Sequence, residues 1–384
     1  MTGNKQDKRS LELYLHIPFC VRKCRYCDFL SGPADCSTQE RYMQALLREI
    51  RERGKECESY QVDTIFIGGG TPSVVEAKGI SQVMQAIREC YDVSPAAEIT
   101  MEMNPGTVNR EKLCAYHKAG INRLSIGLQS VWDEELQSLG RIHTFEQFKE
   151  AYTQAREIGF QNINVDVMSA LPGQSVESWT KTLDVLLSLQ PEPEHISAYS
   201  LILEEGTPLY ESYERGELTL PDEDSERQMY VLTEEILGTA GYARYEISNY
   251  AKAGYQCRHN CGYWRRREYL GLGIGAASLM RETRFKNADH LEPYLKDCLA
   301  VREEEEMLSQ EAQMEEFMFL GLRLMEGVDV RAFADKFGQD IFAVYGQVIE
   351  RNVKDGLLKQ EEGHVRLTKR GIDVSNYVMS QFLF

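Results

Sequence analysis

Three cysteines near the amino end of the chain are the residues best placed to do chemistry. Cys20, Cys24 and Cys27 are spaced C-x3-C-x2-C and directly follow the apolar run Leu11–Ile17. Three thiolates on one short loop can bind three corners of a cubane iron–sulfur cluster. The fourth iron would then have no protein ligand and would stay open to a small molecule. The spacing therefore predicts a [4Fe–4S] cluster with one open iron.

Two simpler interpretations of these cysteines stay open. Cys36 or His16 could complete a closed set of four ligands, which is what a structural zinc ion requires. The three cysteines could also be small buried hydrophobic residues, as we expect for isolated ones such as Cys90. The polar segment Met1–Ser10 has no apolar stretch typical of a secretory signal, so we expect a cytoplasmic protein without disulfides.

Glycines and polar residues follow the next apolar runs. Thr64–Ile67 leads into the sequence Gly68-Gly69-Gly70-Thr71-Pro72. Glycines permit positive φ angles and a close approach of the backbone to a ligand, although a glycine run alone is most often only a turn. Four polar residues lie at or near the ends of later apolar runs, where they could contact a polar ligand or form structural ion pairs: Glu102, Gln129, Arg141 and Asp166.

These residues need elements that bring them to one edge of a fold. Over the first two hundred residues, short apolar runs alternate about six times with segments of helical period. This alternation predicts an α/β fold with parallel strands, either a doubly wound sheet or, preferably, a partial or full TIM-like barrel with its functional residues at the carboxyl ends of the strands. The predicted strands are Leu11–Ile17, Thr64–Ile67, Glu98–Met103, Arg123–Ile126, Asn162–Met168 and Ile196–Leu201.

The pattern changes after Leu203. We expect a helix over Glu223–Ala240 and a short strand over Tyr245–Asn249. The glycine-rich segment Gly271–Ser278 lacks the ending of a phosphate-binding P-loop, so we interpret it as a loop that closes against the barrel mouth. The acidic run Glu303–Glu306 is expected to be a solvated loop or the start of a helix.

The last part of the chain predicts a winged-helix-like α+β domain. From Glu311 the pattern is helix, turn, helix, followed by a hairpin of Leu357–Gln360 and Val365–Thr368 and a final helix over Gly371–Phe384. We therefore expect a barrel over residues 1–210, a barrel extension over residues 211–300 and a C-terminal domain over residues 301–384.

Composition narrows the possible partners. The chain has 43 Lys and Arg against 60 Asp and Glu, a formal net charge of −17. Broad nucleic-acid binding needs clustered cations, so no nucleic acid is expected, and the winged shape should serve structure or protein contact. No apolar run approaches about 18 residues, so no transmembrane segment is expected.

The motifs together carry a family resemblance. The cysteine spacing after a first strand, Tyr26 before the last cysteine and the glycine run after the second strand resemble the radical S-adenosylmethionine (SAM) superfamily, in which SAM chelates the open iron. The whole chain resembles the oxygen-independent coproporphyrinogen III oxidases and their relatives, through Leu15-His16-Ile17-Pro18-Phe19-Cys20, the Gly-Gly-Gly-Thr-Pro run and the winged piece. This resemblance implies SAM contacts at Tyr14, Gly69, Gly70, Thr71, Glu102, Gln129, Arg141 and Asp166.

Within that family the chain departs from the oxidase pattern. The oxidases have a fourth cysteine two residues after the third and a longer amino-terminal extension. Here the third cysteine is followed by Asp28 and Phe29, and about 13 residues precede Tyr14. The chain therefore resembles the haem chaperone branch, HemW.

A second motif, in the segment Cys257–Arg267, reads H-N-x-x-Y-W and is associated with haem binding in that branch. A neutral His259 imidazole is a suitable axial ligand for haem iron, and Tyr263 and Trp264 offer flat apolar area for a porphyrin face. Arg265–Arg267 could pair with the haem propionates. The alternatives are a buried core histidine with solvated arginines, or a zinc site that uses the two flanking cysteines.

These observations favour a haem chaperone that carries a [4Fe–4S] cluster with SAM, binds haem and transfers it to acceptor apo-haemoproteins, membrane respiratory enzymes among them. Transient membrane contact fits this expectation, while a homodimer, the cleavage of SAM and catalysis itself are left open. One alternative is oxygen-independent coproporphyrinogen III oxidation by radical decarboxylation, which the missing fourth cysteine disfavours. The other is a non-catalytic protein with a structural metal site.

Overall fold

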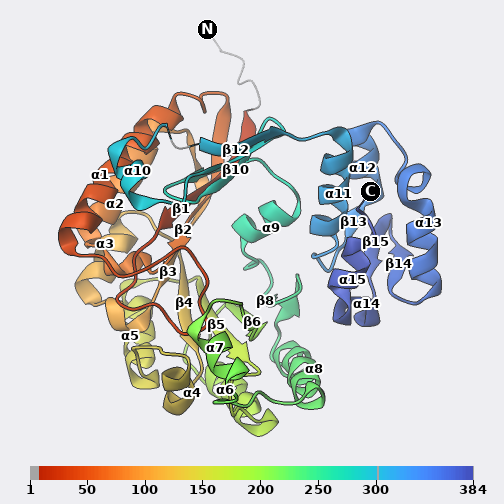
Figure 1. Cartoon of the computed structure of the whole chain (residues 1–384), viewed down its shortest axis with the longest axis horizontal. Helices are drawn as coiled ribbons and strands as arrows, with labels where there is room; N and C mark the ends of the chain where they lie inside the picture. Colours follow the sequence, from red (N-terminus) through yellow and green to blue (C-terminus); the bar gives the residue numbers. More distant parts are fainter. Residues whose placement is uncertain (1–7, 301, 384) are drawn as a thin grey trace.

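The polypeptide folds around one large, curved, open sheet (Figure 1). The structure, a computed structural model, describes residues 8–300 and 302–383, so the expectation for Met1–Ser10 lies largely outside the described residues. The paired strands run in the order β12-β11-β10-β9-β1-β2-β3-β4-β5-β6-β8-β7 and end at β12 and β7. Within the described part of the chain the architecture is therefore a partial barrel and not a closed one.

Strands β1 to β6 are parallel neighbours, and helices connect them. All six predicted strands are present, with bounds that differ by a few residues. The strands are β1 (Arg9–Ile17), β2 (Tyr60–Gly69), β3 (Val93–Met103), β4 (Arg123–Gln129), β5 (Ile163–Ser169) and β6 (His195–Ser200). The helices are α1 (Cys36–Gly54), α2 (Ala77–Cys90), α3 (Arg110–Lys118), α4 (Asp133–Ser138), α5 (Phe145–Ile158) and α6 (Val176–Leu187).

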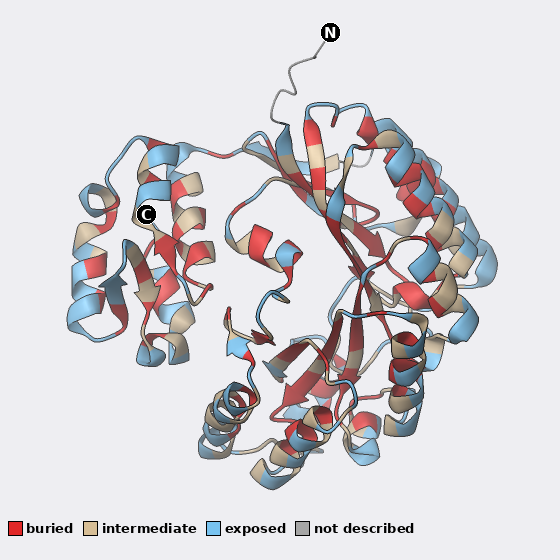
Figure 2. Ribbon diagram, turned by 180° about the vertical axis from the view of Figure 1, so that it is seen from behind, coloured by how far each residue is buried: buried red, intermediate tan, exposed pale blue. Residues whose placement is uncertain are grey.

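The two faces of these strands differ in chemistry. On β4, Leu124 and Ile126 belong to the main hydrophobic core, while Arg123 and Ser125 alternate with them. Because successive side chains of a strand point to opposite faces, the apolar side chains pack under the helices and the polar ones face inward. The helices turn their buried sides to the sheet (Figure 2). A parallel sheet is usually apolar on both faces, so a polar inner face indicates a functional interior.

Further elements extend the sheet at both edges. Strand β9 pairs in parallel with β1, β10 to β12 continue in antiparallel order, and β8 and β7 follow β6. Helix α9 lies between the sheet and the C-terminal domain (Figure 1). The strands are β7 (Ala243–Arg244), β8 (Asn249–Ala251), β9 (Tyr269–Leu272), β10 (Ala277–Met280), β11 (Thr283–Asn287) and β12 (Arg302–Met307). The helices are α7 (Pro208–Glu214), α8 (Glu223–Thr239), α9 (Arg258–Trp264) and α10 (Leu291–Lys296).

Two predictions for this region were wrong, and a third was right only for the centre of its segment. Most of Tyr245–Asn249 is the turn between β7 and β8, where the Glu246 carboxylate accepts the Ser248 N–H at 2.8 Å. Half of Gly271–Ser278 belongs to the ends of β9 and β10, and residues 273–276 form the expected loop, in which Gly275 lines a cavity of the interior. Glu303–Glu306 lies inside β12, where charged side chains on an exposed edge strand discourage pairing with another chain.

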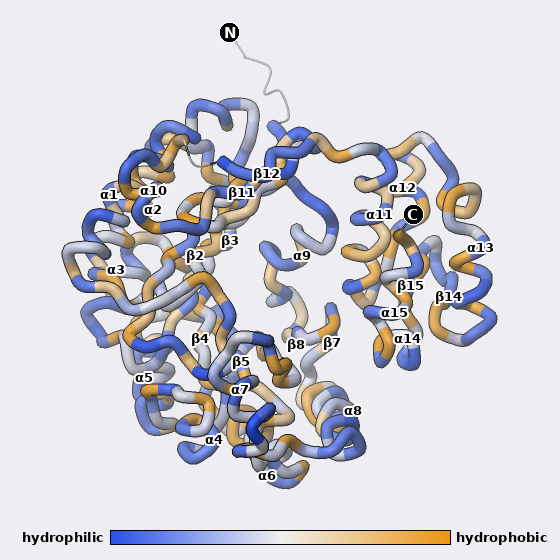
Figure 3. Tube along the Cα trace, viewed as in Figure 1, coloured by the Kyte–Doolittle hydropathy of each residue, from blue (hydrophilic) through white to orange (hydrophobic). Residues whose placement is uncertain are grey.

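The C-terminal domain has its own hydrophobic core, which includes Met318, Phe333, Ile349 and Val365. The predicted hairpin is confirmed, but the last predicted helix is split at Val374 into two short helices. Apolar and polar residues alternate along the domain's helices (Figure 3). Its elements are α11 (Gln310–Gly321), β13 (Val328–Asp329), α12 (Val330–Phe337), α13 (Ile341–Lys354), β14 (Leu358–Glu361), β15 (His364–Leu367), α14 (Lys369–Asp373) and α15 (Ser375–Ser380).

Two further points concern the expectations for the whole chain. The structure describes no helix long and apolar enough to span a bilayer. The domain boundaries at residues 210 and 300 stay predictions.

Candidate functional site

The cysteine loop between β1 and α1 is anchored on both sides. The Cys20 N–H donates to the Gly32 carbonyl at 3.0 Å, and the Arg25 N–H donates to the Leu139 carbonyl at 2.9 Å. The Arg25 guanidinium adds a bond to the Ser138 carbonyl at 3.1 Å. These bonds hold a loop whose three cysteines are free thiols that line a cavity of about 150 Å³.

Polar groups approach the cysteine sulfurs from two other segments. Thr71 Oγ1 lies 3.5 Å from Cys20 Sγ, and Arg141 Nη1 lies 3.7 Å from Cys24 Sγ. Burial raises the pKa of the Cys27 thiol, and the neighbouring Cys24 adds to the rise. Donors of this kind stabilise sulfur-borne negative charge, so the three cysteines fit a cluster that binds thiolates.

The residues suggested for a zinc set do not join these cysteines. His16 uses both ring nitrogens, with Tyr14 Oη at 3.0 Å and the Leu30 carbonyl at 2.8 Å. Cys36 is exposed at the first position of α1. Across residues 8–300 and 302–383, no three His, Cys, Asp or Glu side chains converge as ligands of a single metal ion. Neither His16 nor Cys36 is placed as the fourth ligand that a closed zinc set needs.

The glycine run crosses the cysteine loop at close range. Gly69 has φ of 110°, and a Cβ there would lie 2.7 Å from the His16 ring. A Cβ on Gly70 would lie 2.7 Å from the Phe19 carbonyl oxygen, while the Gly70 N–H donates to the Ile17 carbonyl at 2.9 Å. Only glycine permits this backbone to pass so near the loop.

Two half-buried carboxyl groups lie beside the glycine run. Glu102, at the end of β3, accepts the Gly69 N–H at 3.2 Å. Burial raises its pKa to about 8, and the nearby Asp166 adds to the rise. Asp166 accepts bonds from Asn164 at 2.8 Å and Ser125 at 3.2 Å, and burial raises its pKa too. Two neighbouring carboxyls whose pKa values are both raised would favour a cationic ligand.

His259 enters the same interior from α9. Its side chain is about 1% exposed, and Nδ1 lies 2.7 Å from Thr64 Oγ1. The ring stacks on Phe66 at 5.2 Å between centroids. Nε2 is buried without a hydrogen-bond partner, and the residue lines a cavity of about 450 Å³. Burial, followed by the Arg123 charge, lowers its pKa to about 3, so the imidazole is neutral; in the tautomer whose Nδ1–H donates to Thr64, Nε2 can ligate a metal.

Two buried acidic residues position α9. Glu98 on β3 accepts the N–H groups of Arg258 and His259, each at 3.2 Å. Glu12 on β1 lies against Gly262, and a Cβ at position 262 would overlap the Glu12 carboxyl group. The helix therefore needs a glycine at that position to lie against the sheet.

The arginines after the motif are separated by the fold. Arg265 forms an exposed pair with Glu326 at 2.8 Å. Arg266 is buried and pairs with Glu282 at 2.5 Å and with Glu316 at 2.7 Å. The expectation that these arginines pair with the propionates is not met by Arg265, because the turn after α9 places Arg265 at the surface and Arg266 in the interior.

The predicted site residues converge on three cavities that share Phe29 and Glu102 in their walls. Tyr14 lines the two larger ones, and His259 lines the middle one. Phe29 stands where the oxidase pattern has its fourth cysteine. Around the smallest cavity lie Cys20, Cys24, Cys27, Gly69, Gly70, Thr71, Glu102, Gln129, Arg141 and Asp166.

Sequence reasoning missed several residues of this interior. Arg123, Asn164 and His195 line the middle cavity and are nearly fully buried. His195 bridges Asn164 Oδ1 at 2.6 Å and Tyr245 Oη at 2.8 Å. The signal was present as polar residues at every second position of otherwise apolar strands, which marks a polar inner face.

The fold and the cysteine loop define a radical SAM protein. The family model of the radical SAM superfamily matches residues 14–186, and that of the HemN C-terminal domain matches residues 308–374. The structure of coproporphyrinogen III oxidase (HemN) from Escherichia coli, a radical SAM enzyme, shares this fold, with a TM-score of 0.84 over 98% of this chain and 90% of that chain at 23% identity.

Sequence relatives narrow the class. The haem chaperone HemW of Lactococcus lactis is 36% identical over 371 residues, 96% of each chain. HemW of Bacillus subtilis is 36% identical over 96% of this chain and 98% of its own length. HemW of Escherichia coli is 41% identical over 69% of each chain. The chain belongs to the haem chaperone HemW family, and the family resemblance predicted from the motifs is confirmed.

Proposed function

We propose that this protein is a haem chaperone that holds a [4Fe–4S] cluster on Cys20, Cys24 and Cys27, with SAM at the open iron. When bound, the cluster places a one-electron donor next to SAM. The thiols line one cavity with donors from Thr71 and Arg141 close to their sulfurs, which supports this assignment.

Charge and shape support the SAM contacts that the family resemblance implies. Glu102 and Asp166 offer carboxylates to the positively charged amino and sulfonium groups, because an opposite charge favours their ionised forms. Gly69 and Gly70 have no side chains, so only their backbone atoms line the cavity wall. Tyr14, Thr71, Gln129 and Arg141 complete the proposed contact set.

One observation carries the haem proposal: His259 Nε2 is a buried, unpartnered, neutral ligand atom in the wall of a cavity. Such groups are rare because an unsatisfied buried polar atom costs free energy. A haem iron would satisfy it. The aromatic ring of Tyr263 lies 4.7 Å from the His259 ring and adds flat area at the same wall.

Haem titration of the anaerobically reconstituted protein tests this proposal. In the wild-type protein we expect a Soret band that grows until haem reaches a defined stoichiometry. In His259→Ala the Soret band should be shifted, and the haem affinity should be lower by about tenfold or more, which corresponds to about 1.4 kcal/mol. His143→Gln is the matched control: His143 is equally buried, has an unpartnered Nδ1 and a pKa lowered to about 3 by burial, but lines none of the three cavities. A wild-type protein without a saturable Soret response would overturn the proposal.

The oxidase alternative has its own measurement. Wild-type holoprotein supplied with SAM, a reductant and coproporphyrinogen III without oxygen should form no protoporphyrinogen. Turnover in this assay would replace the chaperone proposal with the oxidase one.

The partners complete the proposal. We propose that the protein acts in the cytoplasm and passes haem to apo-haemoproteins, including membrane respiratory enzymes, either alone or as a homodimer. Support comes from the haem chaperone name of the relatives and from a cavity that barrel residues and α11 of the C-terminal domain line together. Mixing haem-loaded protein with isolated haem-depleted membranes should move the Soret band to the membrane fraction, whereas retention of haem by the protein would contradict transfer.

A further inference from the structure

The largest cavity of the interior, about 720 Å³, lies where the sheet, α9 and the C-terminal domain meet. Phe29 and Leu279 line it from the barrel, and Phe319 and Leu320 line it from α11. Its volume is in the range of cofactor and small-molecule sites. The cavity shares Tyr14, Glu102 and Tyr263 with the cavity that contains His259, so the two adjoin.

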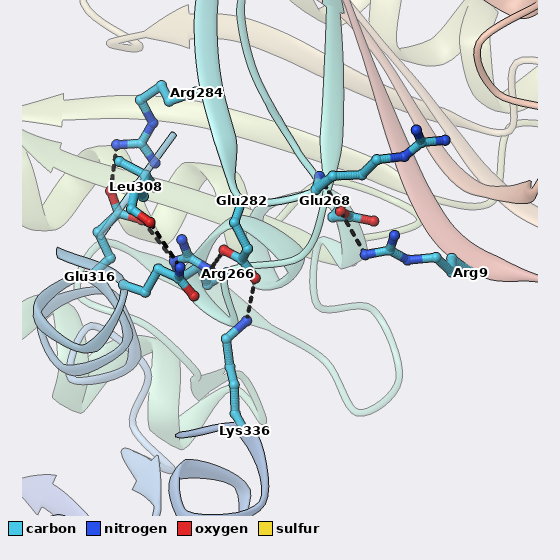
Figure 4. A network of polar contacts seen from close by, with 10 residues as sticks. Arg9, Arg266, Glu268, Glu282, Arg284, Leu308, Glu316 and Lys336 are labelled. Atoms are coloured by element: carbon cyan, nitrogen blue, oxygen red, sulfur yellow. Dashed lines mark hydrogen bonds and ion pairs between the residues drawn. The ribbon is translucent and has the colours of Figure 1, made fainter. Parts of the chain in front are cut away.

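One wall of this cavity carries an ion-pair network (Figure 4). Arg266 binds Glu316 at 2.7 Å and Glu282 at 2.5 Å, Arg284 binds Glu316 at 2.6 Å, and Lys336 binds Glu282 at 3.1 Å. Three cations thus share two carboxylates. Arg266, Arg284 and Glu316 line the cavity, and the network leaves one positive charge at its wall.

Two buried donors in this wall have no acceptor. The Arg266 residue is 6% exposed, yet its Nη2 has no hydrogen-bond partner, and neither does the Trp264 indole Nε1. A buried N–H without an acceptor destabilises the fold, and more so when the group is charged. Because Glu316 and Glu282 occupy Nε and Nη1 of Arg266, Nη2 is the donor left for a ligand, and an anionic oxygen such as a carboxylate would satisfy both it and the indole N–H.

We infer that this wall receives the propionate carboxylates of haem, with Arg266, Arg284 and Trp264 as the donors; the inference rests on the proposed haem-binding function. Arg266 lies two residues beyond the end of α9, and the cavity that it lines adjoins the cavity of His259 through Tyr14 and Tyr263. The apolar residues of the cavity suit the porphyrin edge between these two ends. Glu316 belongs to α11, so the ligand's carboxylates would join the same network that ties the C-terminal domain to the barrel.

Haem and haem dimethyl ester, delivered from the same solvent stock, distinguish carboxylate recognition from binding of the ring alone. We expect wild-type protein to bind haem about tenfold tighter than the ester. A difference of this size corresponds to one charge-assisted hydrogen bond between a propionate carboxylate and an arginine, which the ester cannot form. In Arg284→Gln, haem affinity should fall about tenfold and ester affinity should stay unchanged. Arg284 suits this test because its side chain is 39% exposed and its loss leaves the Arg266–Glu316 pair in place.

Trp264→Phe gives a second, milder variant, because it removes the N–H and keeps the ring area. It should reduce the preference for haem over the ester without loss of the cluster. Arg265→Gln is the matched control, since this neighbouring arginine pairs with Glu326 at the surface and does not line the cavity.

The outcomes separate the two proposals. Equal wild-type affinity for haem and ester, or an unchanged preference in Arg284→Gln, would overturn this inference and leave haem binding at His259 intact. A wild-type protein that binds neither compound would instead defeat the proposed function itself.

Discussion

The interior of this protein has two sides that are built in different ways. The cysteine side comprises the loop Cys20–Cys27 and the glycine run after β2; the α9 side comprises His259, Trp264 and Arg266. Residues of the cysteine side follow consecutive parallel strands, so the sheet itself brings them together. The α9 side comes from a later segment that contacts the sheet through single buried groups and the C-terminal domain through ion pairs.

Because the two sides are held by different contacts, we expect a substitution on one side to have little effect on ligand binding at the other. The cysteine side should tolerate changes in α9, because its backbone bonds run to strand ends and to residues 138–140. The α9 side should respond to changes in the carboxyls and domain contacts that position it. Three predictions test this difference.

The largest effect is expected at the cysteine side. Cys24→Ala should abolish the [4Fe–4S] absorption and with it SAM binding, because only two thiolates of the loop remain. Haem titration should still give a Soret band, since the contacts of His259 do not involve the loop. Iron and sulfide analysis checks the first result, and Cys36→Ala, at an exposed cysteine outside the cavity, should retain a full cluster. Loss of haem binding in Cys24→Ala would show that the two sides are not independent.

A smaller effect is expected where α9 meets the sheet. Gly262→Ala should lower the free energy of unfolding by about 1–3 kcal/mol and weaken haem binding, because the new methyl group displaces the buried Glu12 carboxyl. Thermal unfolding and haem titration check this. The cost should be relieved in a Glu12→Ala background, which a double-mutant cycle measures.

The control for this prediction is the same substitution in another helix. Gly346→Ala in α13 meets nothing closer than 4.0 Å and should be neutral or stabilise by up to about 1 kcal/mol. If Gly262→Ala behaves like Gly346→Ala, the α9 side does not depend on that contact.

The smallest effect is a pH dependence of SAM binding. Glu102 has a pKa raised to about 8, so it is mostly protonated in the free protein at neutral pH. A cationic ligand needs the carboxylate, so SAM affinity should rise with pH towards about 8 and level off above it, by at most about 1.4 kcal/mol per pH unit. Calorimetry between pH 6.5 and 8.5 measures the slope. In Glu102→Gln the pH dependence that comes from the ionisable groups of SAM should remain, and the part that comes from Glu102 should disappear. An equal slope in both proteins would contradict the role of Glu102.

Much of the cysteine side could be predicted from the sequence, because cysteine spacing, glycine runs and strand ends are local features. The placement of Glu102 and Asp166 followed from the rule that parallel strands end at one edge. The same reasoning failed at Glu303–Glu306, where the charges are those of a protected edge strand. It also failed at Arg265–Arg267, because a turn separates neighbouring side chains in a way that residue types do not show.

The sequence by itself determined the βα order, the three-thiol loop and the family, since short spacings and apolar periodicity are written along the chain. Only the tertiary structure decided that Arg284 and Glu316 meet Arg266, that Glu98 positions α9, and that His259 keeps one nitrogen free. These contacts join residues that are far apart in the chain. Their energies depend on burial and on which charges become neighbours, and neither exists until the chain has folded.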